Sequence, residues 1–476
     1  MKENFKIIGE WFLPNQKNRI HGTLNYEKNG KTTLELYGSL TSDNIPELET
    51  HEIILGISSK NKELTLSGCY MTNYESATFV RGKEGAKSSV TYLISYIFIG
   101  IHVSRNDELI FDNISSEIFN LYQWLGISGF KKNELYSKKI KNNEYCIEYK
   151  LPESIEFEID KTYSGKFSFS VNYLGFSNHH GNQQISQQVQ FQICSKNEIN
   201  FLELIKKVNR FKNFLLLALY RNTSILSLKL KGESHKEILA DGRQFKKRIE
   251  LFFSTFHSEN YDRPISFREM IFSYQDIDYK FPELIKNWYS NYDLLEPAFN
   301  LLFEQFYQVS KFNENSFLNL AQSAETFHAR IHNHTKIPRE KYKIMKKEIL
   351  KTTDYKYHKW LNEQFNFGNN LNLHLRLKEI TEKYSNDVID EIISDKDEFI
   401  FQVKHSRNYY THYSNSSKRN ALKESDLNYL SEKLKLLLVC AFLMESGFKK
   451  KELSTLLDNV KWILFNHLAN WSKKNE

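Results

Sequence analysis

The chain has 476 residues, of which 40% are hydrophobic and 14% aromatic, so it can bury more than one apolar core, and two or three domains are expected. Seven prolines and 18 glycines are too few for long disordered linkers, which excludes a largely unfolded protein. The net charge of +7 is concentrated at one end, because residues 400–476 carry 13 Lys or Arg and seven Asp or Glu. A basic C-terminal segment fits a polyanionic partner, although a solvated lysine-rich surface would have the same composition.

Neither the first residues nor the cysteines indicate export or a membrane. The segment MKENFKIIGEW lacks the apolar core and the small-residue cleavage site of a signal peptide. The longest apolar runs, residues 90–103 and 436–444, are shorter than the roughly 20 residues that a membrane span needs. The four cysteines are far apart and form no CxxC pair, which suits a reducing compartment. We therefore expect a cytoplasmic protein that makes no contact with a membrane.

The first 200 residues are expected to be rich in β-strands. Short segments of β-branched and aromatic residues, separated by turn formers, lie at residues 32–37, 63–66, 90–103 and 166–173. In the last of these, the sequence FSFSVNY alternates apolar and polar side chains, which is typical of a strand with one buried face. We assign residues 1–200 to a β-rich N-terminal domain.

The hydrophobic period changes near residue 200, and residues 201–305 are expected to form a mixed α/β connecting region. Apolar residues of the segment 201–219 recur every three or four positions, as in an amphipathic helix. The sequence ILSLKL at residues 225–230 then has the composition of a strand. Pro297 is expected to mark a boundary, because a helix rarely continues through a proline.

The apolar periodicity of residues 306–476 predicts an all-α helical bundle. Stripes of apolar residues at helical spacing lie within residues 317–331, 373–384 and 427–441. Pro338 lies where a further helix would begin, a position that tolerates proline, and Gly447 could cap the last helix. The expected fold class is therefore α+β, with a β-rich N-terminal region followed by an all-α bundle.

The candidate catalytic residues lie in FQVKHSRNYYTHYSNSSKRN, residues 401–420. In the whole sequence, only Arg407 is followed by a histidine, His412, after a gap of four to six residues. Asn408 follows the arginine directly. Residues five apart on a continuous helix point roughly 140° away from each other. A site shared within one chain would therefore require Arg407 at a helix start, with Ser406 as its cap and His412 in the second turn.

These residue types can cleave RNA through its 2′-hydroxyl group, a reaction that needs one base and one acid. Histidine can serve as either near neutral pH, and arginine can bind two phosphate oxygens and stabilise charge in the transition state. We therefore interpret Arg407 and His412 as catalytic, with Asn408 as a supporting residue that orients Arg407. Cations that lie close by in the sequence could bind RNA, namely Lys404, Lys418 and Arg419.

One chain supplies only one such histidine, so an acid and a base of this type require two chains. Two chains that meet about a two-fold axis would place two copies of His412 in one cleft. We therefore expect a homodimer through the helical domain. The alternative interpretation is structural: Arg407 would pair with an acidic residue of a neighbouring helix, and His412 would cap a helix end.

Other motifs give weaker signals. His328 and His332 lie four residues apart on a predicted helix and could share one face as metal ligands. No acidic residue of the HExxH type accompanies them, and His334 is expected to point elsewhere. No GxGxxG, GxxxxGK[ST] or GxSxG motif is present. We therefore expect neither a metal site nor a cofactor.

Several segments resemble the ApeA-like family of anti-phage proteins. The Arg-Asn-x-x-x-His motif is similar to the signature of HEPN domains, and residues 315–333 resemble the opening of the HEPN domain in this family. Residues 9–30 and 99–124 resemble its N-terminal domain. The resemblance implies a metal-independent HEPN endoribonuclease that acts in abortive infection, with RNA as substrate and a phage-derived trigger.

Two alternatives remain open on the sequence. The helical domain could bind RNA or a phage protein without catalysis, or it could be a HEPN toxin that a nucleotidyltransferase partner regulates. Cleavage of RNA by the purified chain would separate the first alternative from the ribonuclease. The neighbouring genes would separate the second.

Overall fold

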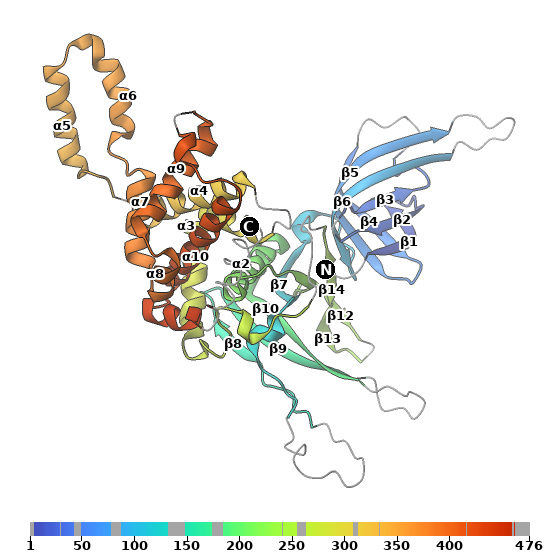
Figure 1. Ribbon diagram of the computed structural model, residues 1–476. Helices are drawn as coiled ribbons and strands as arrows, with labels where there is room; N and C mark the ends of the chain where they lie inside the picture. The colour runs from blue at the N-terminus through green and yellow to red at the C-terminus, as the bar shows by residue number, and fades with distance from the viewer. Residues whose placement is uncertain are drawn as a thin grey trace, which may run out of the picture. The chain divides into compact units, whose positions relative to one another are not determined.

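The computed structural model describes residues 4–28, 30–41, 49–77, 87–131, 148–173, 184–239, 241–254, 263–307, 313–332, 334–415, 417–458 and 461. The chain divides into two compact units. The first comprises Met1–Phe267 and Phe272–Pro282, and the second comprises Arg268–Ile271 and Glu283–Glu476. The predicted α+β fold class is confirmed, because the strands belong to the first unit and the second unit is helical (Figure 1).

The elements of the first unit are mostly antiparallel strands. Its strands are β1 (Phe5–Phe12), β2 (Ile20–Tyr26), β3 (Thr33–Leu36), β4 (Thr50–Ser58), β5 (Glu63–Ala77), β6 (Lys87–Ile99), β7 (Ile110–Ile118), β8 (Ile155–Glu158), β9 (Tyr163–Tyr173), β10 (Ile185–Asn200), β11 (Ile225–Lys231), β12 (Lys236–Ile238), β13 (Gln244–Lys246) and β14 (Ile249–Phe252). Its helices are α1 (Leu121–Leu125) and α2 (Phe201–Leu219). The predicted helix at residues 201–219 and the predicted strand at residues 225–230 are therefore confirmed.

Strand β6 joins a closed ring of strands to an open sheet. The order of the large sheet is β3-β2-β1-β4-β5-β6-β14-β11-β7-β10-β9-β8, and β3 also pairs with β6. One edge of β6 pairs with β5, while the other pairs with β3 at residues 90–93 and with β14 at residues 97–99. The first six strands thus close on themselves, and the remaining strands continue outward from the end of β6.

The interior of the ring is filled by apolar side chains that alternate along its strands. Trp11 of β1 is fully buried there, and its ring lies over Gly56 of β4, the residue with which Trp11 is paired. A Cβ atom at Gly56 would lie 2.4 Å from two carbon atoms of the Trp11 ring. A glycine is therefore required opposite this tryptophan.

A second apolar core of the first unit is built on aromatic rings. Helix α2 packs on β7 and β10, and Phe211 of α2 stacks on Phe191 of β10 with ring centroids 4.0 Å apart. Trp124 of α1 contacts Phe211 at 6.0 Å and Phe167 of β9 at 6.1 Å. Phe167 belongs to the alternating FSFSVNY segment, and its burial confirms that the predicted strand has one face in the core.

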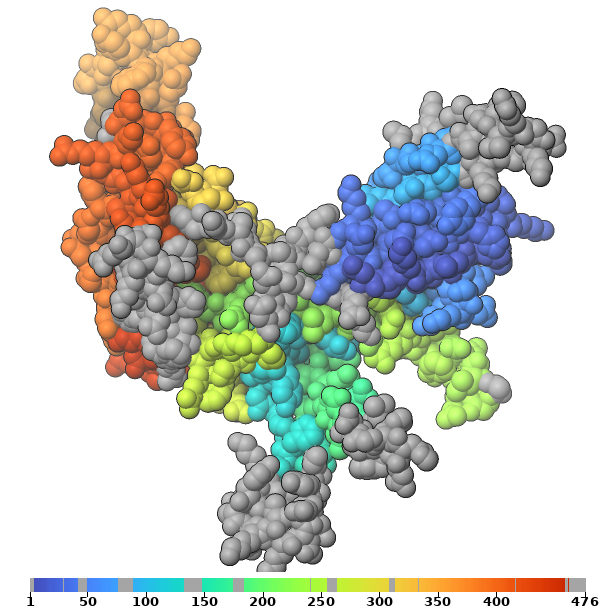
Figure 2. All heavy atoms as spheres, turned by 45° about the vertical axis from the view of Figure 1, so that its right-hand side comes forward, coloured from blue at the N-terminus to red at the C-terminus, as the bar shows by residue number. Residues whose placement is uncertain are grey.

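The second unit is built of helices. They are α3 (Phe281–Tyr307), of which the first two residues belong to the first unit, α4 (Glu314–Ile331), α5 (Arg339–Thr352), α6 (His358–Gly368), α7 (Leu373–Tyr384), α8 (Asp387–Ile393), α9 (Lys396–His412) and α10 (Glu424–Glu445). Helix α10 is buried on nearly all sides from Leu434 to Leu443 and contacts α4, α7, α8 and α9. It is therefore the central helix of the bundle. Helices α5 and α6 form a hairpin that stands away from the other helices of this unit (Figures 1 and 2).

The prediction that Pro297 marks a boundary is wrong, because α3 runs through this residue from Phe281 to Tyr307. A proline inside a helix costs about 3 kcal/mol, since it removes one backbone hydrogen bond. Large buried rings lie on both sides of the proline, at Trp288 and Phe299, and Phe299 packs on Phe442 of α10 with centroids 4.5 Å apart. Burial of these rings offsets the cost of the proline.

The expected connecting region, residues 201–305, is divided between the two units. Strands β11 and β14 pair within the large sheet, whereas α3 from Glu283 onward belongs to the helical unit. The limits at residues 200 and 305 stay predictions.

None of the helices in the described part of the chain combines the length and the apolar character needed to cross a membrane.

Gly56→Ala should lower the free energy of unfolding of the first unit by about 1–3 kcal/mol, because the new methyl group overlaps the buried Trp11 ring. Urea unfolding followed by tryptophan fluorescence measures this change. Ser59→Ala, in the turn that follows the same strand, is the control and should unfold like the wild type. A Gly56→Ala protein as stable as the wild type would contradict the packing of Trp11 described here.

Candidate active site

Helix α9 carries the residues of the Arg-Asn-x-x-x-His motif. The Asp395 side chain caps its first turn by accepting a hydrogen bond of 2.9 Å from the Glu398 N–H. Buried residues then recur along one face of the helix, among them Phe399, Val403 and Tyr410. The helix ends at His412, and Tyr413 follows in the left-handed region with a φ of +48°. The motif therefore occupies the last two turns of a helix that is anchored by its opposite face.

The condition for a site shared within one chain, with Arg407 at a helix start and Ser406 as its cap, is not met. Arg407 lies well inside α9, and His412 is the last helical residue. Ser406 is fully buried, and its hydroxyl oxygen accepts a hydrogen bond of 3.0 Å from the Leu422 N–H. Because the helix is continuous, Arg407 and His412 diverge by roughly 140° and lie about 7.5 Å apart along its axis.

Arg407 forms an ion pair with Glu325 of α4. The distance from Arg407 Nη2 to Glu325 Oε2 is 3.1 Å, and Arg407 Nη1 also donates to Asn408 Oδ1 at 3.5 Å. The side chains of Arg407 and Glu325 are 32% and 27% exposed, so the guanidinium is held in place and still reaches the surface. The acidic partner expected by the structural interpretation of Arg407 is thus present.

Glu325 was missed in the sequence, although a signal for it exists. Glu325 and His328 stand three residues apart on the segment that forms α4, so they lie on neighbouring positions of one face. An acid and a histidine at this spacing indicate a polar face on the opening helix. Which residue of α9 faces this position is a tertiary contact that periodicity does not reveal.

His412 is exposed at the end of α9, and its side chain makes no hydrogen bond with any residue that the structure describes. It lies at the helix terminus, as in the structural interpretation, but the cap of α9 is the backbone N–H of Tyr413, which bonds the Tyr409 carbonyl oxygen. The imidazole is nevertheless accessible to a ligand or to a second chain. In a single chain, however, it does not share a cleft with Arg407.

The three cations expected to bind RNA lie on two segments. Lys404 is half-buried on α9, three residues before Arg407 and therefore on a neighbouring position of the same face. Lys418 and Arg419 are exposed in the short 3-10 helix η6 (Lys418–Asn420). Two hydrogen bonds fasten the end of this loop to α9. Leu422 donates through its N–H to Ser406, and its carbonyl oxygen accepts a bond of 2.9 Å from the Tyr410 hydroxyl.

A cluster of histidines lies one turn beyond Glu325. The prediction that His328 and His332 share a face is confirmed by ring centroids 4.9 Å apart, but the prediction that His334 points elsewhere is wrong. The Nε2 atoms of His328 and His334 lie 2.7 Å and 3.0 Å from the two carboxylate oxygens of Glu379. Within the described ranges, no group of three or more His, Cys, Asp or Glu residues has a geometry that could hold a metal ion.

The buried His328 is held as a neutral imidazole. Its side chain is fully buried, and burial lowers its pKa below the ordinary value of 6.5. Arg376 Nη1 lies 3.4 Å from His328 Nδ1, so Nδ1 accepts from the guanidinium while the Nε2–H group donates to Glu379. Arg376 Nη1 also donates to the Glu325 carbonyl oxygen at 3.3 Å. The polar network thus fixes the turn of α4 that carries the partner of Arg407.

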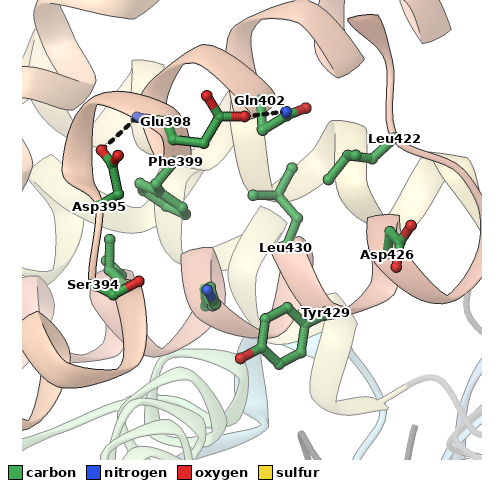
Figure 3. A pocket seen from close by; sticks show the side chains of 11 residues that line it. Ser394, Asp395, Glu398, Phe399, Gln402, Leu422, Asp426, Tyr429 and Leu430 are labelled. Carbon is green, nitrogen blue, oxygen red and sulfur yellow. Dashed lines mark hydrogen bonds between the residues drawn. The ribbon is translucent and has the colours of Figure 1, made fainter. Parts of the chain in front are cut away.

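A cavity of about 270 Å³ lies beside the first turns of α9 (Figure 3). Asp395, Glu398 and Asp426 line it together with Tyr429 and Lys433. Burial lowers the pKa of Lys433, whose ammonium nitrogen lies 4.4 Å from the centroid of the Tyr429 ring. Three carboxylates and one ammonium repel a phosphate more than they attract it, so this cavity does not extend the candidate RNA site.

Comparison with protein families identifies both parts of the chain. The model of ApeA N-terminal domain 1 matches residues 6–288, and the model of the Apea-like HEPN domain matches residues 318–452. The second match includes all of α9 and the Arg407–His412 motif. Searches of curated proteins and of solved structures gave no match.

The buried His328 should make the stability of the helical unit depend on pH. Its lowered pKa means that the unfolded chain binds a proton more readily, so stability is complete above pH 6.5 and is lost as the pH falls below it. In His328→Gln, the pH dependence of the unfolding free energy between pH 7 and 5 should become shallower, by at most about 1.4 kcal/mol per pH unit. Urea titrations at each pH test this; parallel profiles for the two proteins would contradict a neutral His328.

Proposed function

Because the chain belongs to the ApeA family, with an ApeA N-terminal domain followed by an ApeA-like HEPN domain, we propose that it is a metal-independent endoribonuclease acting in anti-phage abortive infection. HEPN domains are generally ribonucleases, which supports the reaction class. The single observation that carries the proposal is the position of the motif. Within the HEPN match, the side chains of Arg407 and His412 both reach the surface, and the imidazole of His412 makes no hydrogen bond within the described structure.

The proposed reaction is attack by the RNA 2′-oxygen on the adjacent phosphorus. One copy of His412 takes the proton of the 2′-hydroxyl group, and a second copy gives a proton to the departing 5′-oxygen. Arg407 binds the nonbridging phosphate oxygens, which gain negative charge in the transition state. The products are a 2′,3′-cyclic phosphate and a 5′-hydroxyl group. Every proton transfer in this scheme uses a side chain, so the scheme calls for no metal ion.

Glu325 is proposed to position Arg407. An arginine side chain has several rotatable bonds, and the ion pair with Glu325 restricts them while using only one of the terminal nitrogens for the carboxylate. The N–H groups that face neither Glu325 nor Asn408 are those that would bind phosphate. Lys404, Lys418 and Arg419 are proposed to bind the RNA backbone on either side of the cleaved bond.

A homodimer through the HEPN domain is proposed because one chain does not bring Arg407 and His412 together. A two-fold axis near the end of α9 would bring two copies of the motif to one cleft, with one imidazole as base and the other as acid. The ApeA N-terminal domain is proposed to receive a phage-derived trigger and to control this dimer. All of these steps would take place in the cytoplasm, where phage and host RNA are accessible.

The alternative functions make different demands on the same residues. A module that only binds RNA or a phage protein would use Arg407 and the lysines but would leave RNA intact. A HEPN toxin regulated by a nucleotidyltransferase would cut RNA until the partner modified or bound it. Incubation of the purified chain with total RNA separates the first of these from the proposed nuclease, and addition of a cognate transferase separates the second.

Arg407→Ala and His412→Ala should each lower RNA cleavage by at least about 100-fold, because each removes a group that acts in the transition state. Cleavage of a labelled RNA should persist in excess EDTA and leave a 2′,3′-cyclic phosphate, as mass spectrometry of the fragments shows. Glu325→Gln should lower the rate less, with kcat more affected than KM. The matched control is His405→Ala, a histidine of the same helix whose ring contacts the Phe401 ring at a centroid distance of 4.1 Å. Cleavage at the wild-type rate by Arg407→Ala or by His412→Ala would contradict the proposal, and so would a 3′-hydroxyl product.

Activity should also require two intact copies of His412. Wild-type and His412→Ala chains are co-expressed with separate tags at varied ratios. If the chains pair at random, the fraction of dimers with two wild-type chains equals the square of the wild-type fraction. Activity should follow that square, because a dimer with one histidine lacks either the acid or the base. A linear dependence on the wild-type fraction would show that one histidine per dimer is enough.

A further inference from the structure

The hairpin of α5, η5 (Tyr355–Tyr357) and α6, here called the basic hairpin (residues 339–368), has no buried core of its own. All three elements are helical, yet none of the residues in α5, η5 or α6 is buried. The two long helices meet through Tyr342 and Phe365, where the Tyr342 hydroxyl donates to the Phe365 carbonyl oxygen at 2.9 Å. A pair of helices this exposed gains little stability from packing against each other or the bundle. The residues on its surface are therefore candidates for binding a partner.

The base of the basic hairpin is closed by backbone and side-chain hydrogen bonds. Asn369 is buried, and its side chain both accepts from the Ile337 N–H at 2.9 Å and donates to the Ile337 carbonyl oxygen at 2.8 Å. Lys336 N–H donates to the Asn369 carbonyl oxygen at 3.0 Å. The chain thus leaves the bundle and returns to it at one fixed point, and the hairpin projects from that point (Figures 1 and 2).

The basic hairpin carries an excess of positive charge. Residues 339–368 contain eight Lys or Arg and four Asp or Glu, a net charge of +4 in 30 positions. Lys343 and Lys356 pair with Glu340 and Asp354, but Lys347, Lys351 and Lys359 make no ion pair with the residues that the structure describes. Lys347 and Lys351 lie one turn apart on α5, so their charges share one face.

The tip of the hairpin combines exposed rings with lysines. The sequence Tyr-Lys-Tyr-His-Lys-Trp occupies residues 355–360, and the side chains of Tyr355, Tyr357 and Trp360 are 84%, 51% and 60% exposed. The Lys356 ammonium nitrogen lies 4.9 Å from the centroid of the Tyr357 ring, so charge and ring are presented together. His358 is not part of this surface chemistry, because its Nε2 atom bonds the Thr353 carbonyl oxygen at 3.0 Å and closes the turn.

This combination fits single-stranded nucleic acid better than the other partners of an exposed hairpin. Aromatic rings stack on unpaired bases, and lysines between them bind the phosphates. A membrane-binding helix separates its lysines from its apolar residues on opposite faces, whereas here rings and lysines alternate over six residues. An interface with a second copy would be depleted of lysine at its centre.

We propose that the basic hairpin binds single-stranded RNA, with the rings of Tyr355, Tyr357 and Trp360 as a stacking platform and the lysines of α5 and α6 as phosphate contacts. This inference rests on the proposed function, in that it names the substrate as unpaired RNA and assigns a second contact outside the Arg407–His412 motif. The hairpin leaves the bundle directly after α4, the helix that carries Glu325, so an RNA held there is held by the same domain.

The test uses the full-length chain and a fluorescent 2′-O-methyl RNA of mixed sequence, which lacks the attacking hydroxyl group and therefore stays intact. Fluorescence anisotropy gives its affinity, single-stranded and as a duplex, for three triple variants. The tip variant is Tyr355→Ala with Tyr357→Ala and Trp360→Ala, and the charge variant is Lys347→Gln with Lys351→Gln and Lys359→Gln. The control removes three exposed rings of the first unit, by Tyr37→Ala, Tyr70→Ala and Tyr173→Ala.

The tip variant should bind the single strand about tenfold or more weakly and the duplex with a smaller loss, because duplex bases are already stacked. The charge variant should weaken both and lessen the dependence on salt, and the control should bind like the wild type. A tip variant with wild-type affinity would overturn the proposal. The proposal would also fail if the tip variant kept its RNA affinity but lost dimerisation, measured by light scattering, or lost binding to anionic phospholipid vesicles. The exposed rings would then serve a protein or membrane contact. Hairpin-dependent binding by a chain that never cuts RNA would refute the nuclease and leave the hairpin proposal standing.

Discussion

The ion pair between Glu325 and Arg407 fixes the candidate site to the bundle. Glu325 occupies the turn of α4 that also carries His328, and Arg376 of α7 contacts that turn through the Glu325 carbonyl oxygen and the His328 ring. The place of one guanidinium therefore depends on contacts among three helices, all held by the apolar faces they turn toward α10. A charge that is fixed in advance stabilises a transition state without having to reorganise, which a mobile surface arginine would not do.

The 3.6-residue period of α9 governs how its faces are used. Phe399, Val403 and Tyr410 take the buried face, Arg407 turns toward α4, and His412 is left at the terminus. A side chain four residues after Arg407, at the exposed position of Thr411, lies on a neighbouring position of the same face, whereas His412, one residue further, is turned away by another 100°. The five-residue spacing thus separates the two side chains within one chain, which is the reason for proposing that a second chain completes the site.

The sequence was informative wherever one element's own pattern decides its structure. The helix at residues 201–219, the alternating strand that contains Phe167 and the leucine-rich α10 follow from their periodicity alone. Contacts between elements were not accessible in this way. The prediction for Pro297 is wrong because buried rings on both sides of it outweigh a local rule. Ser406 does not begin a helix because the start of α9 is set by Asp395, eleven residues earlier. The contacts of Glu325 with Arg407 and of His334 with Glu379 depend on which helices become neighbours, and the motif gives no sign of that.

The position of β14 and β11 between β6 and β7 has a consequence for synthesis on the ribosome. Strands β6 and β7 follow each other in the chain, yet the two strands that join them in the sheet come later, at residues 225–252. At about 5–20 residues per second, the edges of β6 and β7 would wait several seconds to half a minute for their partners. Unpaired edges of this kind invite aggregation, so a nascent chain would need protection during that interval. The last strand of the sheet is made before α4, so the helices of the HEPN domain from α4 onward emerge only after all strands of the sheet.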